Sequence, residues 1–285
     1  MMKPIKFLLA ATLLFFLFSC EEDTQSTDYN ANIATAKDVT LTEDIFRDVF
    51  GIIFQSGYDT ALHASGQKEI LGATVFYQAY EDSVIINVHY PDWPLYCPDD
   101  LYRQGTFRLK LDEELYVDNA EGTLNFNAFA VQYMPVYGSM NIRNMGVNND
   151  SLQKFSVSYD QLEILTQDSV SFIKVSSDRQ LVWKEGSDTP QNFSDDLLLI
   201  EGSASGKSAD GIEFSTQIIT PLGISDTCFY IYGGEYSIST PGLEIKEGAV
   251  KFFSEEECPS RFEMYFDSFR FYEEFLFLYQ PPVLD

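Results

Sequence analysis

Residues 105–111 read Gly105-Thr106-Phe107-Arg108-Leu109-Lys110-Leu111, with an apolar side chain at every second position from Phe107 to Leu111. Successive side chains of an extended chain point to opposite faces. The stretch therefore predicts a β-strand with one buried and one solvent-facing side.

Similar runs, rich in Tyr, Phe, Val, Ile and Thr, recur from about residue 70 onward and are separated by Gly, Asn, Asp and Pro. Turn pairs such as Asp210-Gly211 favour antiparallel hairpins over crossover connections. We expect an all-β chain built as an antiparallel meander sheet, which could form a sandwich, an open barrel or an extended single layer. The other runs lie at residues 82–90, 121–129, 154–159, 168–175, 180–184, 197–203, 212–218 and 228–233.

One amphipathic helix precedes the strands. Apolar residues recur at helical spacing from Leu41 to Phe54, and Thr40 with Glu43 has the spacing of a capping box. This predicts a short helix at about 41–56. Its polar face is acidic, which favours packing against the β body over lying on a membrane surface.

The N-terminus has the pattern of a lipoprotein signal. Lys3 and Lys6 precede a twelve-residue apolar run that is too short to span a bilayer and fits a secretory signal. The run ends in Leu17-Phe18-Ser19-Cys20, which resembles the lipobox of bacterial lipoproteins. This implies a signal peptide at 1–19, lipid attachment at Cys20, a flexible acidic tether at 20–39 and a body at 40–285.

Charge limits the partners. Two of the 18 basic residues lie in the signal, so the mature chain carries about 16 basic against 44 acidic side chains. Such a surface repels polyanions, which makes nucleic-acid binding unfavourable. The acidic residues after Cys20 resemble the export tag of Bacteroidota surface lipoproteins, which implies an outer-membrane, surface-exposed location.

Three cysteines remain after Cys20, so one intramolecular disulfide at most can form and one thiol is left over. An up-down strand pair would bring Cys228 and Cys258 to the same end of the sheet, which favours that bridge. The alternative is a bridge from Cys97 to Cys258. Both Cys97 and Cys258 precede a proline between two expected strands, which suggests two related β units at about 60–165 and 166–285.

Chemical motifs are scarce. The two histidines, His63 and His89, offer no recognisable triad, and we interpret His89 as the end of a strand. No metal spacing is present, although the acids in the loops at 92–100 and 255–257 are possible calcium ligands. We therefore expect a non-catalytic protein with no metal or cofactor.

The strongest binding feature is the loop Tyr90-Pro91-Asp92-Trp93-Pro94-Leu95-Tyr96. Its prolines keep Trp93 out of a regular strand, and aromatic faces beside carboxylates suit sugar rings or a partner protein. Tyr90, Asp92, Trp93 and Tyr96 are therefore candidate binding residues. The alternative is that Trp93 folds back to cap the sheet, whereas Trp183 in an alternating run is expected in the core.

The order of several motifs resembles that of a group of uncharacterised Bacteroidota outer-membrane lipoproteins. The motifs include Arg103-x-Gly105, Arg179-x-x-x-Trp183, the run 202–206, and the late cysteines Cys228 and Cys258. The resemblance implies the fold and the location but no chemistry. We expect a lipid-anchored surface protein that binds a glycan or an envelope protein, the alternatives being a glycan hydrolase with a carboxylate pair and an accessory lipoprotein of an outer-membrane transport or assembly complex.

Overall fold

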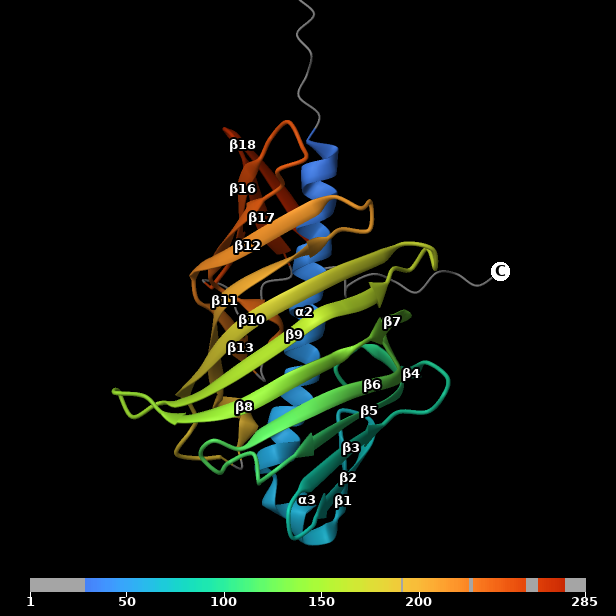
Figure 1. Cartoon of the computed structure of the whole chain (residues 1–285), viewed down its shortest axis with the longest axis vertical. Helices are drawn as coiled ribbons and strands as arrows, with labels where there is room; N and C mark the ends of the chain where they lie inside the picture. Colours follow the sequence, from blue (N-terminus) through green and yellow to red (C-terminus); the bar gives the residue numbers. More distant parts are fainter. Residues whose placement is uncertain (1–28, 191, 226–227, 255–260, 275–285) are drawn as a thin grey trace, which may run out of the picture.

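In the described part of the chain, a long helix is enclosed by a curved sheet (Figure 1). The structure is a computed structural model that describes residues 29–190, 192–225, 228–254 and 261–274, without the side chains of 228–230. Helix α2 (Asn30–Tyr58) runs along the length of the molecule and is followed by the short α3 (Thr60–Ser65). Strands near the chain's C-terminus lie by the start of α2, and β1–β3 lie by its end (Figure 1).

The described residues form eighteen strands in one sheet, with every pairing antiparallel. The first half holds β1 (Gln67–Ile70), β2 (Ala73–Ala79), β3 (Val84–His89), β4 (Leu95–Tyr96), β5 (Tyr102–Leu111), β6 (Glu121–Val131), β7 (Met134–Tyr137), β8 (Ser139–Val147) and β9 (Gln153–Leu165). The second half holds β10 (Phe172–Glu185), the 3-10 turn η2 (Phe193–Asp195), β11 (Leu197–Lys207), β12 (Glu213–Thr220), β13 (Leu222–Ser225), β14 (Cys228–Tyr232), β15 (Glu235–Ser239), β16 (Glu247–Phe252), β17 (Arg261–Phe266) and β18 (Phe269–Glu274).

The expected all-β antiparallel meander is confirmed as a single large sheet. Strands β9 and β10 pair along their length, so the sheet runs without a break across the predicted boundary between residues 165 and 166. The two related β units remain a prediction.

Alternation along the strands decides which side chains face the helix. In β5, Phe107, Leu109 and Leu111 are buried, whereas Arg108 and Lys110 are exposed. Trp183 on β10 is 2% exposed, as expected of a core residue, and its ring lies edge-on to Phe54 of α2 at 4.7 Å between centroids. The core therefore lies between α2 and the inner face of the sheet.

Helix α2 begins about ten residues earlier than predicted, so the expected tether is wrong for residues 30–39. Alanines favour helix in this segment, and its polar side chains bond to strands that are distant in the sequence. Asn32 Nδ2 donates to Thr240 Oγ1 at 3.1 Å, and Lys37 pairs with Glu273 at 3.1 Å. Thr40 lies inside the helix rather than at its start and donates to the carbonyl of Ala36 at 3.0 Å.

The acidic side of α2 is as buried as its apolar side, since Glu43, Asp44 and Asp48 are each no more than 3% exposed. Packing against the β body, the preferred interpretation of this helix, is confirmed. Within the described residues no helix has the length and apolar character needed to cross a membrane.

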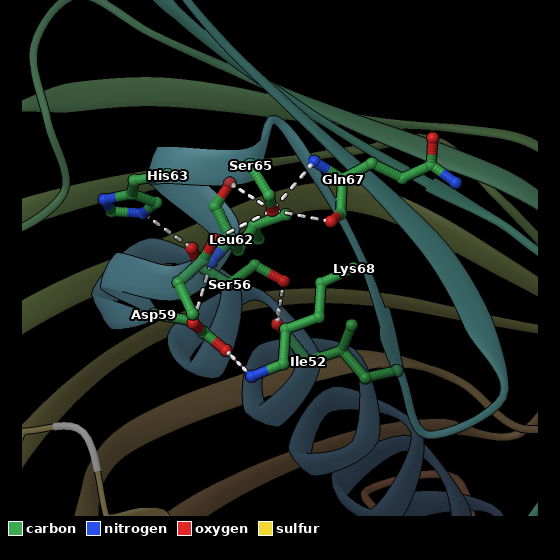
Figure 2. A network of polar contacts seen from close by, with 9 residues as sticks. Ile52, Ser56, Asp59, Leu62, His63, Ser65, Gln67 and Lys68 are labelled. Carbon is green, nitrogen blue, oxygen red and sulfur yellow. Dashed lines mark hydrogen bonds and ion pairs between the residues drawn. The ribbon is translucent and has the colours of Figure 1, made fainter.

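A polar network fixes the bend between α2 and α3 (Figure 2). Asp59 caps α3 by accepting from the amide of Leu62 at 2.9 Å, and it also pairs with Lys68 of β1. Burial raises the pKa of Asp59, but its bonds to Lys68 and Leu62 together hold it below the ordinary value. The network orients α2 toward the first hairpin of the sheet.

Candidate functional site

The loop between β3 and β4 displays Trp93 to solvent. The indole is 67% exposed, so the alternative that it caps the sheet is wrong. The loop is held at its base, where Tyr90 N donates to Gly105 O at 2.9 Å and Gly105 N donates to Pro91 O at 3.0 Å. Trp93 therefore projects from an anchored loop, and Asp92 beside it is also exposed.

Three tyrosines form an aromatic row, defined here as Tyr96, Tyr102 and Tyr133, of which Tyr96 is exposed and the other two are half-buried. The ring centroids of Tyr96 and Tyr102 lie 5.1 Å apart, and those of Tyr102 and Tyr133 lie 5.3 Å apart. Tyr96 is 57% exposed and donates to Asp100 Oδ1, a bond that raises the pKa of its hydroxyl. Gln132 N donates to Tyr102 O at 2.7 Å and Tyr102 N donates to Gln132 Oε1 at 2.9 Å, so the β6–β7 turn, with Tyr133, is held against β5.

Tyr90 does not belong to this surface, so its prediction as a binding residue is wrong. It is 3% exposed, and its ring lies 5.9 Å from the guanidinium carbon of Arg103. Tyr90 is the residue directly after β3, and its side chain continues the inward set of that strand. Of the four candidate residues, the structure leaves Asp92, Trp93 and Tyr96 available to a ligand.

Beneath this surface lies a closed ionic cluster that the sequence interpretation missed. Arg103 is fully buried and bridges Asp48 of α2 and Asp99 of the β4–β5 turn. Its Nε donates to Asp48 Oδ2 at 3.1 Å, and its Nη1 donates to Asp99 Oδ1 at 2.7 Å. Burial lowers the pKa of Arg103, but the two carboxylates raise it well above its ordinary value.

A second buried pair joins Arg179 of β10 to Glu43 of α2. Asp44, the next residue on α2, is fully buried, and the backbone amide of Ile231 in β14 is near its carboxyl group. Burial raises the pKa of Asp44 to about 8, although Arg47 lowers it. Asp44 is therefore mostly protonated at neutral pH.

Strand alternation could have revealed both arginines. Arg103 has the same parity as Phe107 in β5, and Arg179 has the same parity as Leu181 and Trp183 in β10. Both arginines therefore point inward, where a guanidinium needs a carboxylate partner.

Of the four cysteines, only Cys97 has a side chain among the described residues. Cys97 is a buried free thiol that donates weakly to Leu95 O at 3.5 Å, and burial raises its pKa. Cys20 and Cys258 lie outside the described residues, and the side chain of Cys228 is not described. The Cys228–Cys258 bridge and lipid attachment at Cys20 stay predictions.

The two histidines and the possible calcium ligand Asp99 contact other residues of the fold. His63 bonds to the carbonyl of Ser56 at 3.0 Å and stacks on Tyr77, whereas His89 ends β3 as predicted. In the part of the chain that the structure describes, no group of three or more His, Cys, Asp or Glu side chains is arranged to hold a metal ion. Asp99, a possible calcium ligand, instead binds Arg103.

No known protein family, curated protein or solved structure gives a significant match to this chain. The exposed aromatic side chains and the buried charges are therefore the basis for assigning a function.

Proposed function

We propose that the protein is a non-catalytic binding protein of the bacterial cell envelope that recognises sugar rings through Trp93 and the aromatic row. The observation that supports this most is the exposure of two large aromatic side chains, Trp93 in the anchored β3–β4 loop and Tyr96 in β4. Trp93 is 67% exposed and Tyr96 is 57% exposed. Exposed aromatic side chains gathered in one place favour an interaction surface.

The chemistry of the surface suits a carbohydrate. The faces of pyranose rings carry C–H groups that pack on aromatic rings, while their hydroxyls need hydrogen-bond acceptors. Asp92 and Asp100 are exposed acceptors beside the aromatic side chains. A row of tilted rings with centroid spacings of 5.1 and 5.3 Å provides more contact area than a single ring.

Location is part of the proposal. The lipobox-like sequence ending at Cys20 and the acids that follow it support attachment to the outer membrane with the body displayed at the surface. Multiple acylation would make such an anchor stable, because one acyl chain alone gives only marginal binding.

Binding is tested by screening the full chain on a glycan array and then titrating the best oligosaccharide. We expect Trp93→Ala and Tyr96→Ala each to weaken binding by about tenfold or more, since aromatic anchors contribute most to such contacts. Tyr80→Ala is the matched control, because Tyr80 is 55% exposed but lies in the β2–β3 turn.

Unchanged affinity in both Trp93→Ala and Tyr96→Ala would overturn the proposed site. If the chain binds an envelope protein and no glycan, and the same two variants lose that binding, the site is retained but the ligand class changes. Anchoring is tested separately by palmitate labelling, which should disappear in Cys20→Ser; labelling that persists would contradict lipid attachment at Cys20.

A further inference from the structure

A cavity of about 120 Å³ lies between α2 and the strands that cover its C-terminal half. Its apolar lining includes Phe54 of α2, Phe193 of η2, Leu198 of β11 and Ile224 of β13. Arg47 of α2 also lines it. Three carboxyl groups, those of Asp48, Asp99 and Asp196, line it as well. The cavity thus combines apolar side chains with one guanidinium and three carboxyl groups, and it shares no lining residue with the aromatic row.

Two of the three nitrogen atoms of the Arg47 guanidinium are not satisfied by the protein. Arg47 is 8% exposed, and its Nε and Nη2 atoms are buried without a hydrogen-bond partner. A buried guanidinium costs several kcal/mol unless acceptors compensate it. A ligand oxygen that enters the cavity would supply the hydrogen-bond acceptor that these two nitrogen atoms lack.

The three carboxyl groups in the lining bond to groups other than Arg47. Asp48 and Asp99 both bind Arg103, and Asp196 Oδ1 accepts from the indole of Trp183 at 2.9 Å. Asp44 is neutral near pH 7, because burial raises its pKa to about 8. None of these four forms an ion pair with Arg47 among the described residues.

A comparison of two glycines of α2 gives independent evidence that the cavity is open space. At Gly57 an added Cβ would lie 2.4 Å from Leu115 Cδ2, so packing requires glycine there. At Gly51, which lines the cavity, an added Cβ would meet nothing within 4 Å. Glycine in a helix interior is unfavourable, and packing does not demand it at Gly51, but it leaves the cavity open.

We propose that this cavity binds a small carboxylate with a short apolar tail, whose oxygens accept from Arg47. The size fits a few carbon atoms rather than a long acyl chain, because an engineered cavity of about 150 Å³ holds one benzene. The formal charge of −26 repels anions at long range, so affinity depends on the short-range pairing with Arg47.

Butyrate is the probe, and butyramide is its neutral counterpart. Trp183 reports on the site because it bonds to Asp196 and contacts Phe54, both of which line the cavity. A Trp93→Phe background leaves Trp183 as the single indole of the full chain. We expect a saturable change with butyrate and at least about tenfold weaker binding of butyramide, since charge-assisted hydrogen bonds are the stronger ones.

Substitutions then assign the contact. Arg47→Met should abolish the preference for butyrate, and Gly51→Leu should remove binding of both probes by filling the cavity. Arg143→Met, at an exposed arginine of β8, should change neither. A flat butyrate titration, equal affinities for the two probes, or unchanged butyrate binding in Arg47→Met would each overturn the proposal, and the first two need no substitution near the cavity.

Discussion

Arg103 and Arg47 are two buried guanidinium groups near Asp48, the first bonded to it and the second next to it in the sequence. Arg103 is fully buried and is bonded to Asp48 and Asp99, whereas Arg47 is 8% exposed and has unpartnered donors beside a cavity. The same chemical group therefore joins α2 to the β4–β5 turn in one place and keeps free hydrogen-bond donors in the other. The paired carboxylates give Arg103 a structural role, whereas the unpartnered donors of Arg47 face a cavity that a ligand could enter.

The largest expected effect follows from opening the closed cluster. Arg103→Met leaves Asp48 and Asp99 buried without their cation, so we expect the free energy of unfolding to fall by about 3–5 kcal/mol. Urea unfolding measures the loss. The control is Arg143→Met, whose partner Glu121 is exposed, and it should change stability by less than about 1 kcal/mol; comparable losses in the two variants would refute the structural role of Arg103.

Asp44 gives a pH-dependent effect. Its pKa is about 8 in the fold and about 3.9 in an unfolded chain, so the folded state holds a proton that the unfolded state releases between these values. The contribution of Asp44 to stability is therefore complete below pH 4 and falls as the pH rises toward 8. Glu43, Arg47 and Asp48 are the charged neighbours on the same helix.

Asp44→Asn removes this titration. Compared with the unmodified chain, the variant should gain up to about 1.4 kcal/mol of relative stability per pH unit between pH 5 and 8. Urea midpoints at each pH measure the difference between the two slopes. Parallel slopes would show that Asp44 is ionised in the fold.

The two glycines of α2 predict opposite signs for the same substitution. Gly51→Ala should raise the free energy of unfolding by about 1 kcal/mol, because alanine favours helix and the new methyl enters open space. Gly57→Ala should lower it, because the methyl overlaps Leu115. Thermal unfolding of the pair distinguishes these outcomes, and a loss at Gly51 would argue against an open cavity.

The smallest effect on stability is expected at the surface. Trp93→Ala should change the free energy of unfolding by less than about 0.5 kcal/mol, because the indole is 67% exposed. We expect Trp93→Ala to change ligand binding and not stability. A large loss of stability would mean that Trp93 packs against the body and is not a free binding residue.

Alternation along the strands predicted the β-strands and the core position of Trp183, turn residues predicted the antiparallel pairing, and the prolines beside Trp93 predicted a loop but left open whether its indole is exposed. The same alternation places Arg103 and Arg179 at inward-facing positions of their strands. Their carboxylate partners on α2 could not be predicted, because they depend on how the sheet wraps around the helix. Local sequence does not specify that wrapping. The early start of α2 was missed for the same reason, because its first turns are stabilised by distant residues such as Thr240 and Glu273.

The central claim is that the fold needs Arg103 but does not need Arg47, and urea unfolding of Arg47→Met beside Arg103→Met at neutral pH tests it directly. We predict that Arg47→Met unfolds at the same urea concentration as the unmodified chain or a higher one, since it removes a buried charge without a partner, while Arg103→Met unfolds much earlier. Equal destabilisation by the two substitutions would contradict the claim.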